Sequence, residues 1–275
     1  MRVRSGLARS IHLSHATVRF AAIVTVVVGA AAGAITLALG DGPADAVQMG
    51  ILAGGAAFIA WALTREIAPD HPITAGAAAV LSPALLIAGP VDLLVAGLLI
   101  LPVRIVAGTT GRDLTLIDIG ALAVGAAALS FRESGVAVAL LLGLAPAASA
   151  WWARGSRRLL IGSSCVIATG VVALTLFLAD HDPWVAPVGF ERGILLGGLA
   201  AGLVAAWVVP PVTSPVDSRK GGRVLTLRIR LARLAALVAG VSTALWAGGT
   251  GVMALGPAWV ALAVTAVSSI ATLGD

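Results

Sequence analysis

Long apolar runs separated by short polar connections constrain this chain more than any other feature. Ten runs approach the roughly 20 residues that a helix needs to cross a hydrocarbon core about 30 Å thick. They cover residues 20–39, 46–63, 73–88, 91–106, 115–131, 135–152, 159–178, 193–209, 231–248 and 252–272. With 59% hydrophobic and 11% charged residues, the chain is predicted to be an all-α polytopic transmembrane bundle of about ten helices.

The basic residues indicate how such a bundle would be oriented. Lys and Arg near helix ends accumulate on the cytoplasmic side of a membrane. Ten crossings with both termini cytoplasmic place every basic residue except Arg132 and Arg192 on that side. The shorter runs 73–88 and 91–106 could cross fully or form a re-entrant pair, since both arrangements keep this orientation.

This topology predicts one membrane domain in four parts. A basic cytoplasmic segment (1–19) precedes helices one to eight (20–209), and a basic cytoplasmic loop (210–230) precedes helices nine and ten (231–275). Anionic lipids are the expected partners of the basic inner segments. Nucleic acid is not an expected partner, because the basic residues lie between the apolar runs, where the positive-inside rule explains them.

The N-terminal region also resembles a secretory signal peptide, with an Arg-rich lead, an apolar run and Ala-Asp-Ala at 44–46. An uncleaved first helix is favoured, because the run is longer than the usual 7 to 15 residues. The expected location is the plasma membrane. The excess of Arg over Lys, together with much Ala, Gly and Val, indicates a bacterial source of high GC content.

Two polar clusters raise the possibility of an active site. Glu66, Asp70 and His71 lie in the predicted inner loop after helix two, whereas residues 180–182 (Asp-His-Asp) lie in an outer loop. The two clusters are predicted to lie on opposite faces of the membrane. A joint site is rejected, because one loop would have to cross the hydrocarbon core with unsatisfied polar backbone groups. Asp70 is predicted to cap the next helix. The outer cluster is interpreted as a solvated loop, not a metal site, and Cys165 cannot form a disulfide within the chain.

Polar residues within or near the spans are the candidates for a substrate path, because burying them in lipid is costly. Asp92 is predicted to lie in the first turn of the helix that contains it, where its carboxylate complements the helix dipole. Asp118 lies three residues after Thr115, a spacing typical of a capping box, with gating or proton coupling as the alternative. Arg104 is expected to reach the inner headgroups or, as the alternative, to bind phosphate. The other candidate residues for the substrate path are Ser82, Ser163 and Ser164.

Small residues four apart predict close helix packing within the chain or between copies of it. Four pairs have this spacing, namely Gly29 with Gly33, Gly50 with Gly54, Gly193 with Gly197 and Gly198 with Gly202.

No nucleotide-binding, hydrolase or metalloprotease motif is found, so an enzyme is the less favoured class and no cofactor is expected. Ten spans with both termini inside are similar in topology to the drug/metabolite transporter superfamily, where five helices repeat in inverted order. Pro83 and Pro102 have no counterparts in the second half, and no motif is shared, so no family is assigned.

The leading hypothesis is therefore a permease-like transporter of a small or lipophilic solute. One alternative is a non-catalytic accessory or assembly subunit of a membrane complex. The other is an envelope-lipid enzyme that uses outer acids such as Asp41, Asp45 and Asp180.

Overall fold

The computed structural model describes Ser5, Leu7 and residues 14–152, 157–178, 186–214 and 223–272. Within these residues the chain folds into ten α-helices and two short 3₁₀-helices, η1 and η2, with no β-strand. The bounds are α1 Ala16–Ala38, α2 Pro43–Ile67, α3 Pro72–Leu81, η1 Ser82–Ile87, α4 Leu93–Ala107, α5 Leu116–Ser130, η2 Glu133–Gly135, α6 Val136–Ala150, α7 Arg157–Leu178, α8 Gly189–Trp207, α9 Thr226–Ala254 and α10 Gly256–Ala271. Each of the ten predicted runs overlaps an α-helix, and the run 73–88 is divided between α3 and η1.

Helix length separates the helices into two groups. Six are long and apolar enough to cross a membrane, namely α1, α2, α6 together with η2, α7, α8 and α9. The other apolar helices, α3 with η1, α4, α5 and α10, are shorter. The chain is therefore an all-helical protein with several membrane-compatible helices.

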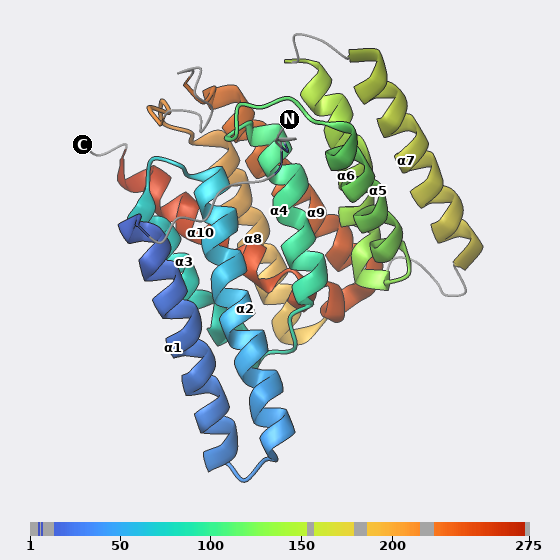
Figure 1. Ribbon diagram of the computed structural model, residues 1–275. Helices are drawn as coiled ribbons and strands as arrows, with labels where there is room; N and C mark the ends of the chain where they lie inside the picture. The colour runs from blue at the N-terminus through green and yellow to red at the C-terminus, as the bar shows by residue number, and fades with distance from the viewer. Residues whose placement is uncertain are drawn as a thin grey trace.

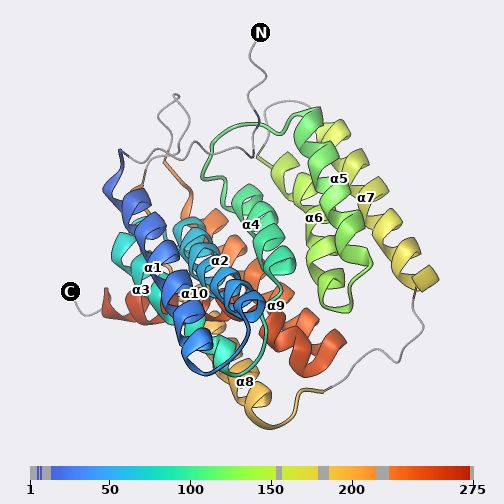
Figure 2. The ribbon, with the colours of Figure 1, turned by 60° about the horizontal axis from the view of Figure 1, so that its bottom comes forward.

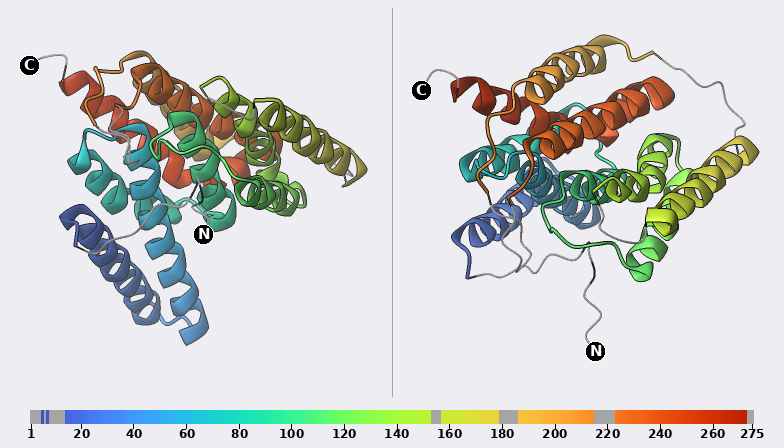
Figure 3. Two further views of the ribbon diagram at one scale, coloured as in Figure 1. Left: turned by 45° about the horizontal axis from the view of Figure 1, so that its top comes forward. Right: turned by 90° about the horizontal axis from the view of Figure 1, so that it is seen from above.

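Helix α2 lies at the centre of one half of the bundle and contacts α1, α3, α4 and α10. The hairpin of α1 and α2 projects from one end of the molecule (Figure 1). Helix α7 packs on α5 and α6 at the far edge, so that α1 and α7 lie on opposite sides (Figures 2 and 3).

Consecutive helices place alternate connections at two ends. At the basic end, as we call it, α2, α4 and α8 finish at Ile67, Ala107 and Trp207 and α9 starts at Thr226. The opposite end carries residues 39–42, 88–92 and 131–135. Among the described arginines, only Arg132 and Arg192 lie at the opposite end.

Glycines bring α1 and α2 into backbone contact. A Cβ atom added to Gly29 would lie 2.8 Å from the carbonyl oxygen of Gly50, and one added to Gly54 would lie 2.8 Å from that of Thr25. In the same way, Gly33 of α1 faces the backbone of α2, and Gly50 of α2 faces the backbone of α1. Only glycine permits this separation.

The glycines of α8 divide into two sets. Gly198 faces the Trp259 ring of α10, and Gly202 faces Leu237 of α9. A Cβ atom at Gly193 or Gly197 would meet no described atom within 4 Å. One glycine stripe of α8 thus packs inside the bundle, while the other borders open space.

Two helix boundaries differ from the predicted ones. Helix α9 begins at Thr226, inside the segment 210–230 that was expected to be a loop. The run 73–88 is not one α-helix, because α3 ends at Leu81 and the chain continues as the 3₁₀-helix η1 through Pro83. Proline removes a backbone donor and disfavours continuation of an α-helix.

The prediction that Asp70 caps the next helix is wrong. His71 is the residue at the start of α3, and no side chain caps that end. Asp70 instead accepts hydrogen bonds from the Thr213 and Ser214 backbone amides at 2.6 and 2.7 Å, so it joins the α2–α3 and α8–α9 connections.

Candidate functional site

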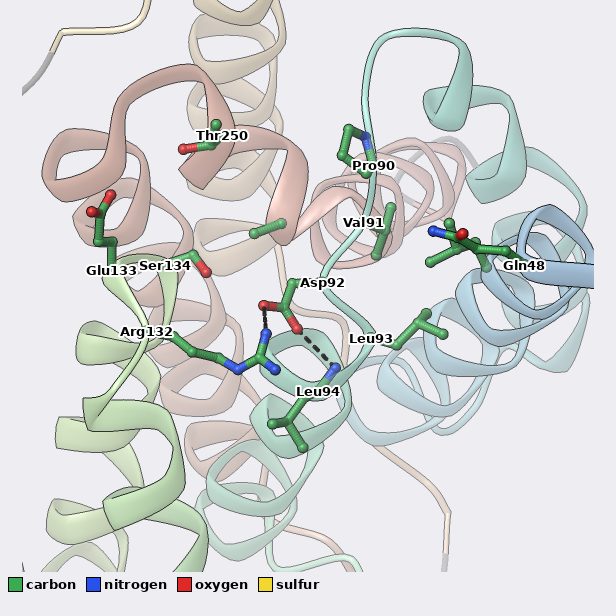
Figure 4. A pocket seen from close by; sticks show the side chains of 12 residues that line it. Gln48, Pro90, Val91, Asp92, Leu93, Leu94, Arg132, Glu133, Ser134 and Thr250 are labelled. Carbon is green, nitrogen blue, oxygen red and sulfur yellow. Dashed lines mark hydrogen bonds and ion pairs between the residues drawn. The ribbon is translucent and has the colours of Figure 1, made fainter. Parts of the chain in front are cut away.

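An open cavity of about 630 Å³ lies at the opposite end of the bundle. We call it the Arg132 cavity (Figure 4). Its walls come from α2, the segment leading into α4, the α5–α6 turn and the end of α9. The lining residues are Gln48, Leu52, Pro90, Val91, Asp92, Leu93, Leu94, Arg132, Glu133, Ser134, Thr250 and Ala254.

Asp92 organises the floor of this cavity. Its Oδ1 accepts hydrogen bonds from the backbone amides of Leu94 at 3.0 Å and Val95 at 3.2 Å. Asp92 therefore caps α4 from the position just before the helix, whereas it was predicted to lie in the first turn. Its Oδ2 pairs with a guanidinium nitrogen of Arg132 at 2.8 Å. The Arg132 side chain is 49% exposed and lines the cavity.

Gly248 shapes the wall that faces this ion pair. Its φ of 61° and ψ of −140° break α9, as only glycine readily allows. The chain then folds back closely, since a Cβ atom on Gly251 would lie 2.1 Å from the Thr243 carbonyl oxygen. This return brings Thr250 to the cavity, where its hydroxyl donates to the Ala247 carbonyl.

A second polar group joins α2 and α4 at the basic end. Glu66 is fully buried, and its Oε1 accepts a hydrogen bond from Arg104 Nε at 2.8 Å. The Thr109 hydroxyl donates to Glu66 Oε2, and Arg104 also donates to the Leu7 carbonyl at 2.9 Å. Helices α2 and α4 therefore flank the Arg132 cavity at the opposite end, and the Glu66–Arg104 ion pair joins them at the basic end.

This arrangement corrects two interpretations. Glu66 belongs to the last turn of α2 and not to a loop. The Arg104 side chain, which was expected to reach the inner headgroups, is only 15% exposed and is bound by Glu66. Burial of a lone charge is expensive, which explains why the two residues occur together.

A smaller cavity of about 280 Å³ lies beside this ion pair, between α1, α2 and α4. We call it the Arg65 cavity. It is lined by Val18, Phe58, Trp61, Ala62, Arg65, Glu66, Gly97, Ile100, Leu101 and Arg104. Arginines line its basic-end part, and apolar side chains line the rest.

Two arginines of α9 perform a role that the sequence analysis missed. Arg233 is buried and donates to the carbonyls of Ile67, Ala205 and Val208, at the ends of α2 and α8. Arg228 donates to the carbonyls of Ile105 and Val106 at the end of α4. These carbonyls lack partners within their own helices, so the arginines cap three helix ends.

The substrate-path candidates lie on separate elements. Asp118 is buried, forms the predicted capping box with Thr115 and accepts a hydrogen bond from the Ser5 hydroxyl. Ser163 donates to the Leu160 carbonyl, and Ser164 accepts from the Ala147 amide. Ser82 is buried where α3 meets η1. None of these four lines either cavity, whereas Arg104 lines the Arg65 cavity.

The outer acids do not form a group in the described part of the chain. Asp41 and Asp45 are exposed at the tip of the α1–α2 hairpin. Asp180, His181 and Asp182 lie outside the described residues. The described residues contain no cluster of three or more His, Cys, Asp or Glu side chains that could hold a metal ion.

No protein-family model, curated protein or solved structure matches this chain.

Proposed function

We propose that the chain is a permease-like plasma-membrane protein of bacterial origin that moves a small solute through a bundle of ten crossings with both termini cytoplasmic. The Arg132 cavity is the observation that carries this proposal. Its volume falls in the range of small-molecule sites, and it combines apolar walls with a few convergent polar groups.

The distribution of side chains supports a membrane setting and this orientation. Helix α1 exposes Phe20, Ile23 and Val26, each at 45% or more, as a lipid-facing helix does. The described arginines concentrate at the basic end, which the positive-inside rule assigns to the cytoplasm. The Arg132 cavity then opens outward. Close packing of α1 on α2 favours a first helix that is retained rather than cleaved.

The cavity does not continue to the basic end, because buried side chains and an ion pair lie below it. A transport cycle would therefore require α4 to move away from α2. Val95, Ala96 and Leu99 are fully buried below the cavity. The Glu66–Arg104 pair then seals the basic end. We propose that this arrangement is an outward-open state and that passage of a solute requires this ion pair to separate.

The polar groups of the cavity bear on the class of solute. Asp92 and Arg132 neutralise each other, so this pair leaves no net charge for a solute to compensate. A small solute with hydrogen-bonding groups complements such a lining better than a large anion does.

The test compares metabolites inside and outside cells of a deletion strain that carries the wild-type gene or a variant. We expect the wild-type gene to restore the partition of one soluble compound and Arg132→Gln to lose at least half of that restoration. Arg192→Gln is the matched control, since Arg192 is the other arginine at this end and does not line the cavity. Equal restoration by both variants would remove the cavity from the mechanism.

The accessory-subunit function is a second candidate because of α8. The open space beside Gly193 and Gly197 offers a surface on which a partner helix could pack closely. Unchanged metabolites and lipids in the deletion strain would favour it.

A further inference from the structure

We infer that the Arg132 cavity binds a small zwitterion of the α-amino acid class that carries an apolar side chain. This inference rests on the proposed function, because it names the class of solute for the same cavity. It is carried by the hydrogen-bonding capacity that remains in the Asp92–Arg132 pair, by the opposite charges of that pair, and by the apolar residues beside it.

Arg132 keeps most of its donors for a ligand. A guanidinium has five N–H donors in one plane. The Arg132 side chain uses Nη1, which pairs with Asp92 Oδ2 at 2.8 Å, and it has no other partner among the residues that the structure describes. The Nε and Nη2 donors can therefore bind a carboxylate through two parallel hydrogen bonds.

Asp92 keeps room for one more hydrogen bond. A carboxylate offers about four lone-pair sites. Oδ1 accepts from the amides of Leu94 and Val95, and Oδ2 accepts from Arg132. The Asp92 side chain is 19% exposed and lines the cavity. Its Oδ2 can therefore accept a hydrogen bond from an ammonium group that lies in the cavity.

The two charges of the pair favour a ligand that carries both signs. An anion that approaches Arg132 also meets the Asp92 carboxylate, and a cation that approaches Asp92 also meets the guanidinium. A zwitterion avoids both conflicts, because its carboxylate can bind Arg132 while its ammonium binds Asp92. The two side chains are in direct contact, and one carbon atom separates the two charged groups of an α-amino acid, so both can be bound together.

Apolar side chains lie next to the pair. Val91 and Leu93, which flank Asp92 in the chain, lie between the ion pair and Gln48 of α2 (Figure 4). Leu52 of α2 also lines the cavity. Burial of apolar surface is favourable, so an apolar side chain of the ligand would be bound here.

The test measures the apparent Kd of three compounds for the purified full-length protein in detergent by ligand-observed NMR titration. The compounds are leucine, 4-methylpentanoate, which lacks the ammonium group, and 3-methylbutylamine, which lacks the carboxylate. We expect leucine to bind at least tenfold more tightly than either analogue. Absence of leucine binding, or comparable binding of either analogue, would overturn the inference.

Two variants should change the order of affinities in opposite directions. Asp92→Asn keeps a residue suited to capping α4 but removes the negative charge, so it should weaken leucine and favour 4-methylpentanoate. Arg132→Gln should weaken leucine at least tenfold and favour 3-methylbutylamine. A purely structural disturbance would weaken all three compounds together, and that result would overturn the inference.

Two controls remove the same charges elsewhere at this end of the bundle. Asp45→Asn and Arg192→Gln change exposed residues that do not line the cavity, so leucine binding should be unchanged. A loss of leucine binding in these controls as large as in Asp92→Asn and Arg132→Gln would overturn the inference.

The binding assay also separates this inference from the proposed function. If leucine does not bind but the partition of another soluble compound depends on Arg132, the inference fails and the proposed function stands. If leucine binds as expected but Arg132→Gln changes no metabolite partition, the inference stands and the proposed function fails.

Discussion

At the scale of single residues, charged side chains join helices that are distant in the sequence. Glu66 and Arg104 are 38 positions apart, so no local spacing reveals the pair. The capping box of Asp118 could be predicted, because it depends on residues within one turn. Local capping can therefore be predicted from the sequence, whereas a pair between distant helices cannot.

Breaking the Glu66–Arg104 pair from one side should destabilise the protein strongly. We expect Glu66→Gln to lower the free energy of unfolding by about 3 kcal/mol, because it leaves the Arg104 charge largely buried without its counter-ion. The double variant Glu66→Gln with Arg104→Gln should recover most of this loss. Reversible unfolding in mixed micelles measures both. A single variant as stable as the wild type would contradict the assignment.

Asp70 gives a prediction for pH dependence. Burial acts to raise its pKa, but hydrogen bonds from Ser214 and Thr213 outweigh burial and hold the pKa below the ordinary value for aspartate. A carboxyl group with a lowered pKa in the folded state stabilises the protein above its unfolded-state pKa of about 3.9. That stabilisation is lost as the pH falls through the lower folded-state pKa.

We therefore expect Asp70→Asn to reduce the melting temperature at pH 7, and we expect this reduction to become smaller as the pH falls below about 3.9. Asp113→Asn is the control, because Asp113 is exposed in the α4–α5 connection at the same end. A difference between wild type and Asp70→Asn that stays constant down to pH 3 would be inconsistent with this role.

At the scale of helices, apolar length predicted the ten α-helices but not how their ends are satisfied. The stretch from 226 to 230 contains Arg228 and Arg230 and was predicted as loop because of its charge. Arg228 and Arg233 instead cap carbonyls of helices that lie far away in the sequence. Such partners are backbone atoms and carry no sequence signal, so this use of arginine could not be foreseen.

Neighbouring arginines of α9 offer a matched comparison. Arg233→Gln should cost about 3 kcal/mol of unfolding free energy, because buried carbonyls on α2 and α8 lose their donors. Arg230 is exposed, so Arg230→Gln should change stability by less than about 0.5 kcal/mol. Urea or detergent unfolding of the two variants provides the measurement, and equal effects would show that burial of Arg233 is unimportant.

Glycines at helix contacts should respond to alanine with opposite signs. Gly29→Ala places a Cβ atom 2.8 Å from the Gly50 carbonyl oxygen, so we expect a loss of about 1 to 3 kcal/mol as α1 moves away from α2. Gly197→Ala meets open space and should stabilise α8 by about 0.5 to 1 kcal/mol. Thermal melting in detergent distinguishes the two. Stabilisation by Gly29→Ala would contradict the close contact.

At the scale of the whole molecule, the sequence predicted a helical bundle but not its cavities. The Arg132 cavity combines residues from four separated segments. The break at Gly248 lies at the end of the predicted run 231–248, but the fold-back that brings Thr250 to the cavity could not be predicted from that boundary. Of the predicted path residues, Asp118, Ser82, Ser163 and Ser164 are distributed over three parts of the bundle. A polar residue inside a predicted span could therefore be recognised as buried, but the sequence did not indicate which of these residues line the same cavity.

The proposed orientation has the Arg132 cavity open to the outside and the basic end in the cytoplasm. Labelling of single cysteines with a membrane-impermeant maleimide tests it most directly, in a protein whose exposed Cys165 is first replaced by serine. Thr250→Cys should label in intact cells, and Asp113→Cys should label only after the membrane is permeabilised. Labelling of Asp113→Cys in intact cells, with Thr250→Cys protected until permeabilisation, would reverse the orientation and contradict the account.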